Sequence, residues 1–78
     1  MNKEIEIEEA LRVAEEHIKE HGLEIQLKDA ECVSEDDKLK LKYRFTVKDG
    51  KPVDTDVLRE IIREIAFVFR VRIEFSQI

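Results

Sequence analysis

The sequence predicts an α+β domain, a two-layer sandwich in which two helices pack on one face of a three-stranded sheet in the order α-β-β-α-β. Residues 38–48 alternate between apolar and polar or charged side chains without a break, which indicates a strand with one buried face. Residues 2–21 and 54–68 instead repeat their apolar residues every three or four positions, which indicates amphipathic helices. Burying these apolar surfaces in one core leaves the opposite face of the sheet open to solvent.

The first helix is expected over residues 2–21. Asn2 can act as its N-cap, and the glutamates that follow lie near the positive end of the helix dipole. Gly22 supplies the left-handed residue with which many helices end. The stretch EIEIE at residues 4–8 also fits the start of a strand, but its glutamates disfavour that interpretation.

The second helix is expected over residues 54–68, with Asp54 or Thr55 as its N-cap. Its apolar residues recur at helical spacing and predict one buried face. This face consists of Val57, Leu58, Ile61, Ile62 and Ile65.

Two further strands complete the predicted sheet. Residues 23–29 alternate cleanly, but the phase slips after Asp29, which indicates either a β-bulge or the end of regular pairing. The stretch SEDD at 34–37 is a predicted turn. In the last ten residues, FRVRIEFSQI, alternation places Arg70 and Arg72 on the outer face of the closing strand. Its inward residues are Phe69, Val71, Ile73 and Phe75.

The composition is that of one small folded domain spanning residues 1–78. Hydrophobic and charged residues each make up 42% of the chain, and 19 acidic against 14 basic residues give a net charge of −5. This apolar content excludes a disordered chain, and the net charge is not that of a strongly basic nucleic-acid binder. Because no stretch has the apolar length of a signal peptide or a membrane span, we expect a cytoplasmic protein, or a recombinant one if designed, with no membrane contact.

The predicted outward positions of the sheet are mostly basic, so the sequence predicts an open basic face. Such a face is a candidate contact surface for nucleic acid or for an acidic protein. The alternative is that these side chains keep an exposed sheet soluble and prevent edge-to-edge aggregation. No aromatic residue falls in the outward phase, so any nucleic-acid binding is expected to be weak and salt-sensitive. The candidate contact residues are Lys38, Lys40, Lys42, Arg44, Arg70 and Arg72.

No combination of residues predicts a catalytic or metal site. His17 and His21 have the spacing of metal ligands on a helix, but the sequence places no third ligand beside them. Cys32 is the only cysteine, so an intramolecular disulfide is excluded, and its strand position suggests a small, partly buried hydrophobic residue. Gly22 and Gly50 are the only glycines, too few for a phosphate-binding loop. We therefore expect no enzymatic activity, no metal and no cofactor.

From Val13 to Ile78 the chain resembles the C-terminal domain of the polymerase-suppressor family, which includes the bacterial sporulation protein YaaT. The resemblance lies in EEHIKEHGLEIQLKDAE, in FTVKDG at the end of the central strand, and above all in LREIIREIAFVFRVRIEFSQI. It implies the same α-β-β-α-β order. It also implies an association with RNA turnover and with protein complexes rather than with a catalytic site in this segment.

Two functional hypotheses follow. In the first, the chain is a stable stand-alone domain, designed or redesigned and without a natural function, as its strict alternation and strong helix formers suggest. Free Cys32 and the phase slip favour redesign of a natural backbone over full design. In the second, the chain is an RNA-turnover-associated module that binds nucleic acid or protein through the basic sheet face. We expect a monomer, with a dimer through an edge strand as the alternative.

Overall fold

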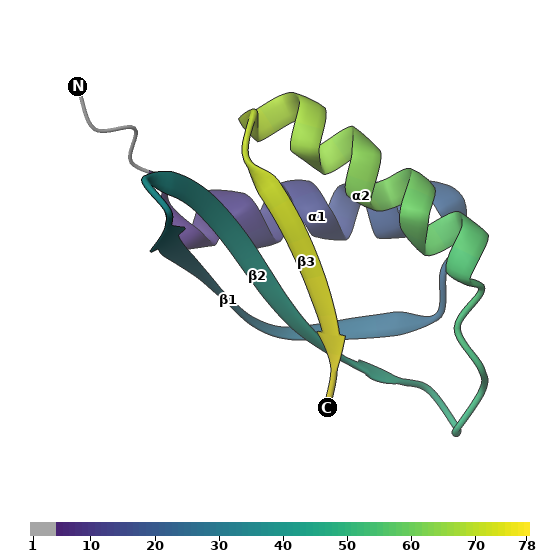
Figure 1. Ribbon diagram of the computed structural model, residues 1–78. Helices are drawn as coiled ribbons and strands as arrows, with labels where there is room; N and C mark the ends of the chain where they lie inside the picture. Colours follow the sequence, from purple (N-terminus) through teal and green to yellow (C-terminus); the bar gives the residue numbers. More distant parts are fainter. Residues whose placement is uncertain (1–4) are drawn as a thin grey trace.

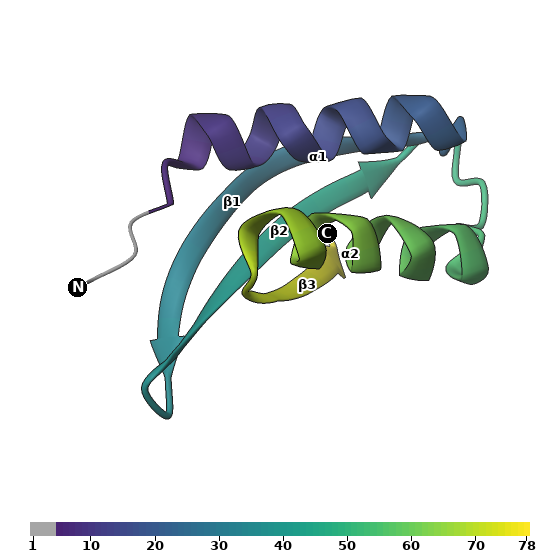
Figure 2. The ribbon, with the colours of Figure 1, turned by 90° about the horizontal axis from the view of Figure 1, so that it is seen from above.

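The computed structural model describes residues 5–78 and places two helices against one face of a three-stranded sheet (Figure 1). Seen from above, α1 lies along β1 and α2 lies along β3, with the helices side by side (Figure 2). The predicted α+β class and the order α-β-β-α-β are confirmed. The elements are α1 (Ile7–His21), β1 (Ile25–Glu35), β2 (Lys38–Val47), α2 (Thr55–Phe69) and β3 (Arg72–Gln77).

The central strand of the sheet is β2. It pairs with β1 in antiparallel and with β3 in parallel orientation, giving the order β1-β2-β3. The β1–β2 turn uses Asp36 and Asp37, both with positive φ (50° and 63°), as the tight turns of β-hairpins require and as Asp tolerates. A parallel pair needs a crossover connection, which α2 provides between β2 and β3.

A β-bulge lies in β1 where the sequence changes phase. Leu27 pairs with Phe45, but the next pair joins Asp29 to Arg44, so Lys28 has no partner in β2. Of the two interpretations of the phase slip, the bulge is correct. Pairing then continues to Glu35, well beyond the predicted strand at 23–29, and every later residue of β1 changes the face on which it lies.

The described part of α1 begins later than the sequence suggests. Glu6 occupies the N-cap with an extended backbone (φ −74°, ψ 130°), and its side chain makes no capping hydrogen bond. Ile5 and Ile7 both pack against the core, although residues two apart point to opposite sides of a helix. An extended segment before Ile7 allows both side chains to reach the core. The predicted cap Asn2 lies outside the described residues.

The other helix ends follow the sequence closely. Gly22 ends α1 in the left-handed conformation (φ 66°), and its N–H bonds the Lys19 carbonyl at 3.1 Å. Asp54 caps α2, because its carboxylate accepts hydrogen bonds from the backbone N–H groups of Asp56 and Val57 at 3.1 and 3.3 Å. Asp54 rather than Thr55 is therefore the N-cap.

The hydrophobic core lies between the sheet and the two helices. Its largest completely buried side chains come from β2 and α2, and they are Leu41, Tyr43, Ile61 and Ile65. Phe45 is 3% exposed, so the predicted phase of β2 is confirmed. One prediction for α2 is wrong, because Ile62 is only partly buried and, unlike Val57 and Leu58, is not among the residues that pack against the core.

Tyr43 joins the sheet to the helix layer. Its hydroxyl donates a 2.7 Å hydrogen bond to the Ala10 carbonyl in α1, and its ring stacks on Phe75 of β3 with ring centroids 4.7 Å apart. Burial raises the pKa of Tyr43 well above its ordinary value. One β2 side chain thereby contacts both a helix and a neighbouring strand.

Glu64 of α2 joins the two helices through both histidines of α1. His17 Nδ1 lies 2.7 Å from Glu64 Oε1, and His21 Nε2 lies 3.1 and 3.0 Å from the two carboxylate oxygens. The hydrogen bond from His17, followed by that from His21, lowers the pKa of Glu64. His17 Nδ1 and His21 Nε2 therefore each donate an N–H to Glu64, because an ionised carboxylate can only accept hydrogen bonds.

The Tyr43 hydroxyl provides a test of the sheet–helix contact. Tyr43→Phe keeps the buried ring but removes the hydrogen bond to Ala10, so it should lower the free energy of unfolding by roughly 1 kcal/mol. Urea unfolding should show a lower midpoint at an unchanged slope. A midpoint equal to that of the parent would mean that the bond contributes nothing.

Replacing Glu64 with Gln should give a pH-dependent loss of stability. Because the pKa of Glu64 is lower in the folded state, its carboxylate stabilises the fold at pH values above the unfolded pKa, and this contribution is lost as the pH falls through the folded pKa. The difference between parent and Glu64→Gln should therefore be present near neutral pH and vanish in acid. Urea midpoints measured across acidic and neutral pH check this.

The matched control for this experiment is Glu60→Gln on the same helix. Glu60 is exposed and makes no ion pair within residues 5–78, so its replacement should leave the pH profile of the parent unchanged. A Glu64→Gln difference that stays constant with pH, or that grows as the pH falls, would contradict the role assigned to the carboxylate.

Candidate functional site

The open face of the sheet is not the basic surface that the sequence suggests. Lys38, Lys40, Lys42 and Arg44 do share one face of β2, but the bulge brings acids of β1 onto the same face. Within the ladder, Asp29 stands opposite Arg44, Glu31 opposite Lys42 and Glu35 opposite Lys38. On the other side of β2, Glu74 stands beside Lys42. A row of cations thus runs between acids on both neighbouring strands.

Two of the predicted contact residues are held in ion pairs on this face. Arg44 binds both carboxylate oxygens of Asp29, with Nε at 2.8 and 3.1 Å, and this hydrogen bonding lowers the pKa of Asp29. Lys40 Nζ lies 2.7 Å from Glu74 and 3.7 Å from Glu35, and the bond to Lys40 lowers the pKa of Glu74. Lys40 and Arg44 are therefore already neutralised within the domain.

Arg70 does not lie on the strand where alternation placed it. It is the C-cap of α2, in the left-handed conformation (φ 57°), and its N–H bonds the Ala66 carbonyl at 2.7 Å. The helix extends to Phe69 and the strand begins only at Arg72. The predicted outward position of Arg70 on the sheet is therefore wrong, and its side chain lies at one end of the molecule.

Three of the six predicted residues gather around a hollow at this end. Lys38 opens β2, Arg70 ends α2 and Arg72 opens β3, and all three line one hollow. Its remaining lining residues are Leu39, Ala66 and Val71. No ion pair joins these three cations to any residue between 5 and 78, although Glu35, opposite Lys38 in the ladder, is directed toward Lys40. We call Lys38, Arg70 and Arg72 the cationic end.

An exposed aromatic ring adjoins the cationic end. Phe67 is 77% exposed, and the guanidinium carbon of Arg70 lies 5.8 Å from the centre of its ring. Strand alternation does not indicate this exposure, but the helical spacing of Phe67 does. Phe67 follows the buried Ile65 by two residues, a spacing that places it on the opposite side of α2.

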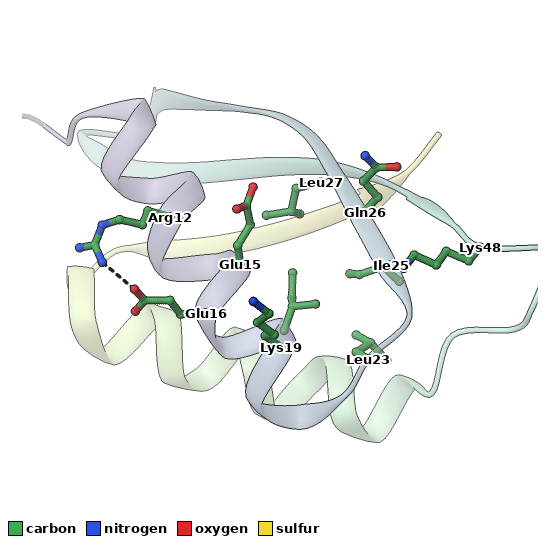
Figure 3. Close-up of a pocket in the computed structure, with 10 residues that line it drawn as sticks. Arg12, Glu15, Glu16, Lys19, Leu23, Ile25, Gln26, Leu27 and Lys48 are labelled. Atoms are coloured by element: carbon green, nitrogen blue, oxygen red, sulfur yellow. Dashed lines mark hydrogen bonds and ion pairs between the residues drawn. The ribbon is translucent and has the colours of Figure 1, made fainter.

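A second hollow lies between α1 and β1 (Figure 3) and contains none of the six predicted residues. Arg12 and Glu16, which form an ion pair at 2.7 Å, lie on its helix side together with Lys19. Its strand side carries the apolar Leu27. Because acids and bases are mixed around this hollow, it favours neither anions nor cations.

The histidines and the cysteine are accounted for by the fold. His17 and His21 both bond to Glu64, and the described part of the chain contains no group of three or more His, Cys, Asp or Glu side chains arranged to hold a metal ion. Cys32 is a partly buried thiol of β1, paired with Leu41. Neither described helix has the length and apolar content needed to cross a bilayer.

Comparison with known proteins identifies the family. The model of the PSP1 C-terminal conserved region matches residues 1–78, whereas no curated protein and no solved structure matches the chain significantly. The match includes the segments that carry the resemblance to the polymerase-suppressor family, and it argues against a purely designed sequence. The chain belongs to the family of the PSP1 C-terminal conserved region.

Proposed function

We propose that this domain is a non-catalytic module that binds nucleic acid through the cationic end. The observation that carries the proposal is the convergence around one hollow of three cations, Lys38, Arg70 and Arg72, that form no ion pair within residues 5–78. Phosphate groups are bound mainly by Lys and Arg side chains, whose contacts release condensed counterions. Because the polymerase-suppressor family, which the chain resembles, is associated with RNA turnover, RNA is the ligand to test first.

The pairing of charges favours the cationic end over the sheet face. A phosphate that approaches Arg44 or Lys40 must displace the carboxylate of Asp29 or Glu74. A phosphate at the cationic end displaces no carboxylate of the described part of the chain. The net charge of −5 repels a polyanion as a whole, so binding should be weak, independent of sequence and sensitive to salt.

The left-handed backbone conformation of Arg70 supports a functional role for its side chain. Left-handed helix caps are usually glycine, because a residue with a Cβ adopts positive φ at a cost of roughly 1 kcal/mol. Arg70 adopts φ 57° there. A cation at this position costs conformational energy, which is consistent with a contact to a ligand.

The candidates for general acid–base chemistry have structural roles, which supports a binding function without catalysis. Both histidines of the chain bond to Glu64, and the Tyr43 hydroxyl bonds to a buried carbonyl. Lys40 and Arg44 are held by acids. An acidic protein segment is the alternative occupant of the cationic end, and the experiment below separates the two.

Charge reversal at the cationic end tests the proposal. Each phosphate contact to a single strand contributes about −0.7 to the slope of log K against log salt concentration, so three contacts predict a slope of about −2 for the parent. This slope corresponds to a roughly 20-fold loss of affinity between about 50 and about 200 mM salt. Arg70→Glu with Arg72→Glu should lower RNA affinity at least about tenfold and make the slope shallower by about 1.4. Fluorescence anisotropy with a labelled RNA oligonucleotide measures both.

The matched control is Lys19→Glu with Lys48→Glu, which changes the net charge equally at two lysines that line the other hollow, between α1 and β1 (Figure 3). It should reduce RNA affinity much less than the test pair, because exposed charges beyond about 10 Å are largely screened. Equal losses for both pairs would show a non-specific charge effect. Binding of polyglutamate without binding of RNA would indicate an acidic protein partner, and either result would overturn the proposal.

A single substitution should separate stability from binding. Arg70→Gly removes the conformational cost of a left-handed residue with a Cβ, which should stabilise the fold by roughly 1 kcal/mol. Losing the contact between Arg70 and Phe67 partly offsets this gain. We therefore expect the melting temperature to stay equal or rise while RNA affinity falls. A variant that loses stability while keeping its affinity for RNA would show that Arg70 serves the fold and not a ligand.

A further inference from the structure

We infer that the ligand of the cationic end is a single-stranded nucleic acid, with one base stacked on the ring of Phe67 and its phosphates on Arg70 and Arg72. This inference rests on the proposed function and specifies the ligand class. Sequence alternation gave the sheet face no aromatic residue. The structure supplies one from α2, beside the cations.

Phe67 is unusual among the aromatic residues of the domain. It is the only aromatic residue with an exposed side chain in the part of the chain that the structure describes, at 77%. Tyr43 and Phe45 are buried, while Phe69 and Phe75 are partly buried against the core. The adjacent Val68 is also exposed, at 51%, so the end of α2 presents a continuous apolar surface, which favours a contact outside the fold.

Arg70 places the ring and the hollow next to each other. The same side chain lines the hollow with Lys38 and Arg72 and lies 5.8 Å from the Phe67 ring centre. The guanidinium covers one side of the ring, and the 77% exposure leaves the other side available to a base. Aromatic rings beside Arg and Lys are the usual components of sites for single strands.

Stacking distinguishes single strands from duplexes. The bases of a duplex are stacked on one another and cannot reach Phe67, whereas a single strand exposes the face of each base. Stacking of one base on an aromatic side chain contributes roughly a 5- to 150-fold increase in affinity. The phosphate contacts alone would bind duplex and single strand with little preference, so Phe67 sets the preference.

A tryptophan reporter detects the stacked base directly. The chain contains no tryptophan, so Phe67→Trp introduces a single indole at the proposed stacking position. Single-stranded RNA should quench its fluorescence in a saturable, salt-dependent manner, while duplex RNA of the same sequence should not. The control Ile78→Trp carries its indole at a position that is also exposed (63%) but lies at the other end of β3 (Figure 1), and it should show no quenching.

Affinity measurements on Phe67→Ser and Phe67→Tyr complete the test, with circular dichroism to confirm folding. Serine should lower the affinity for single-stranded RNA at least about fivefold and leave duplex binding unchanged, whereas tyrosine should preserve both. Parent binding that depends on Arg70 and Arg72 but is unaffected by Phe67→Ser, or equal affinity for duplex and single strand, would overturn this inference and leave the proposed function intact. A parent that binds no RNA would overturn both.

Discussion

The strict alternation of β2 is the constraint on which the rest of the structure depends. Leu41, Tyr43 and Phe45 are at most 3% exposed, and both other strands pair with this one. Tyr43 reaches the α1 backbone through its hydroxyl and stacks on Phe75 of β3. Because successive side chains of a strand point to opposite faces, burying these three residues forces Lys40, Lys42 and Arg44 onto the open side. The core thereby determines where the cations of β2 lie.

The sequence predicts those elements whose signal is local. The bounds of β2 and α2 agree with the alternation and the helical repeat to within one residue, because each pattern is carried by consecutive side chains and one buried face. The course of β1 after Asp29 could not be predicted in the same way. A phase slip looks the same whether pairing stops or resumes past a bulge, and only the partner strand decides between them.

The bulge at Lys28 also explains why the candidate site was predicted only in part. With the phase of β1 changed, Asp29 and Glu31 stand opposite Arg44 and Lys42, so the open face carries mixed charges. Arg70 was misplaced for a related reason. The alternation of FRVRIEF begins inside α2, and nothing in the local pattern shows that the helix runs on to Phe69 and turns through a left-handed residue. Tertiary packing sets both positions.

An acidic domain can carry a site for anions because local pairing outweighs net charge. At physiological salt the interaction between exposed charges fades beyond about 8 Å, so the glutamates on the outer surface of α1 act only weakly on a distant ligand. A bound phosphate therefore interacts mainly with those nearby cations whose neighbouring carboxylates pair with other residues. Glu35 and Glu74 are both directed to Lys40, which leaves Lys38 and Arg72 without an acid partner among the residues described here. The carboxylates that bind Lys40 and Arg44 therefore neutralise much of the middle of the sheet, whereas no acid of the described residues pairs with the cations at the end where α2 and β3 meet.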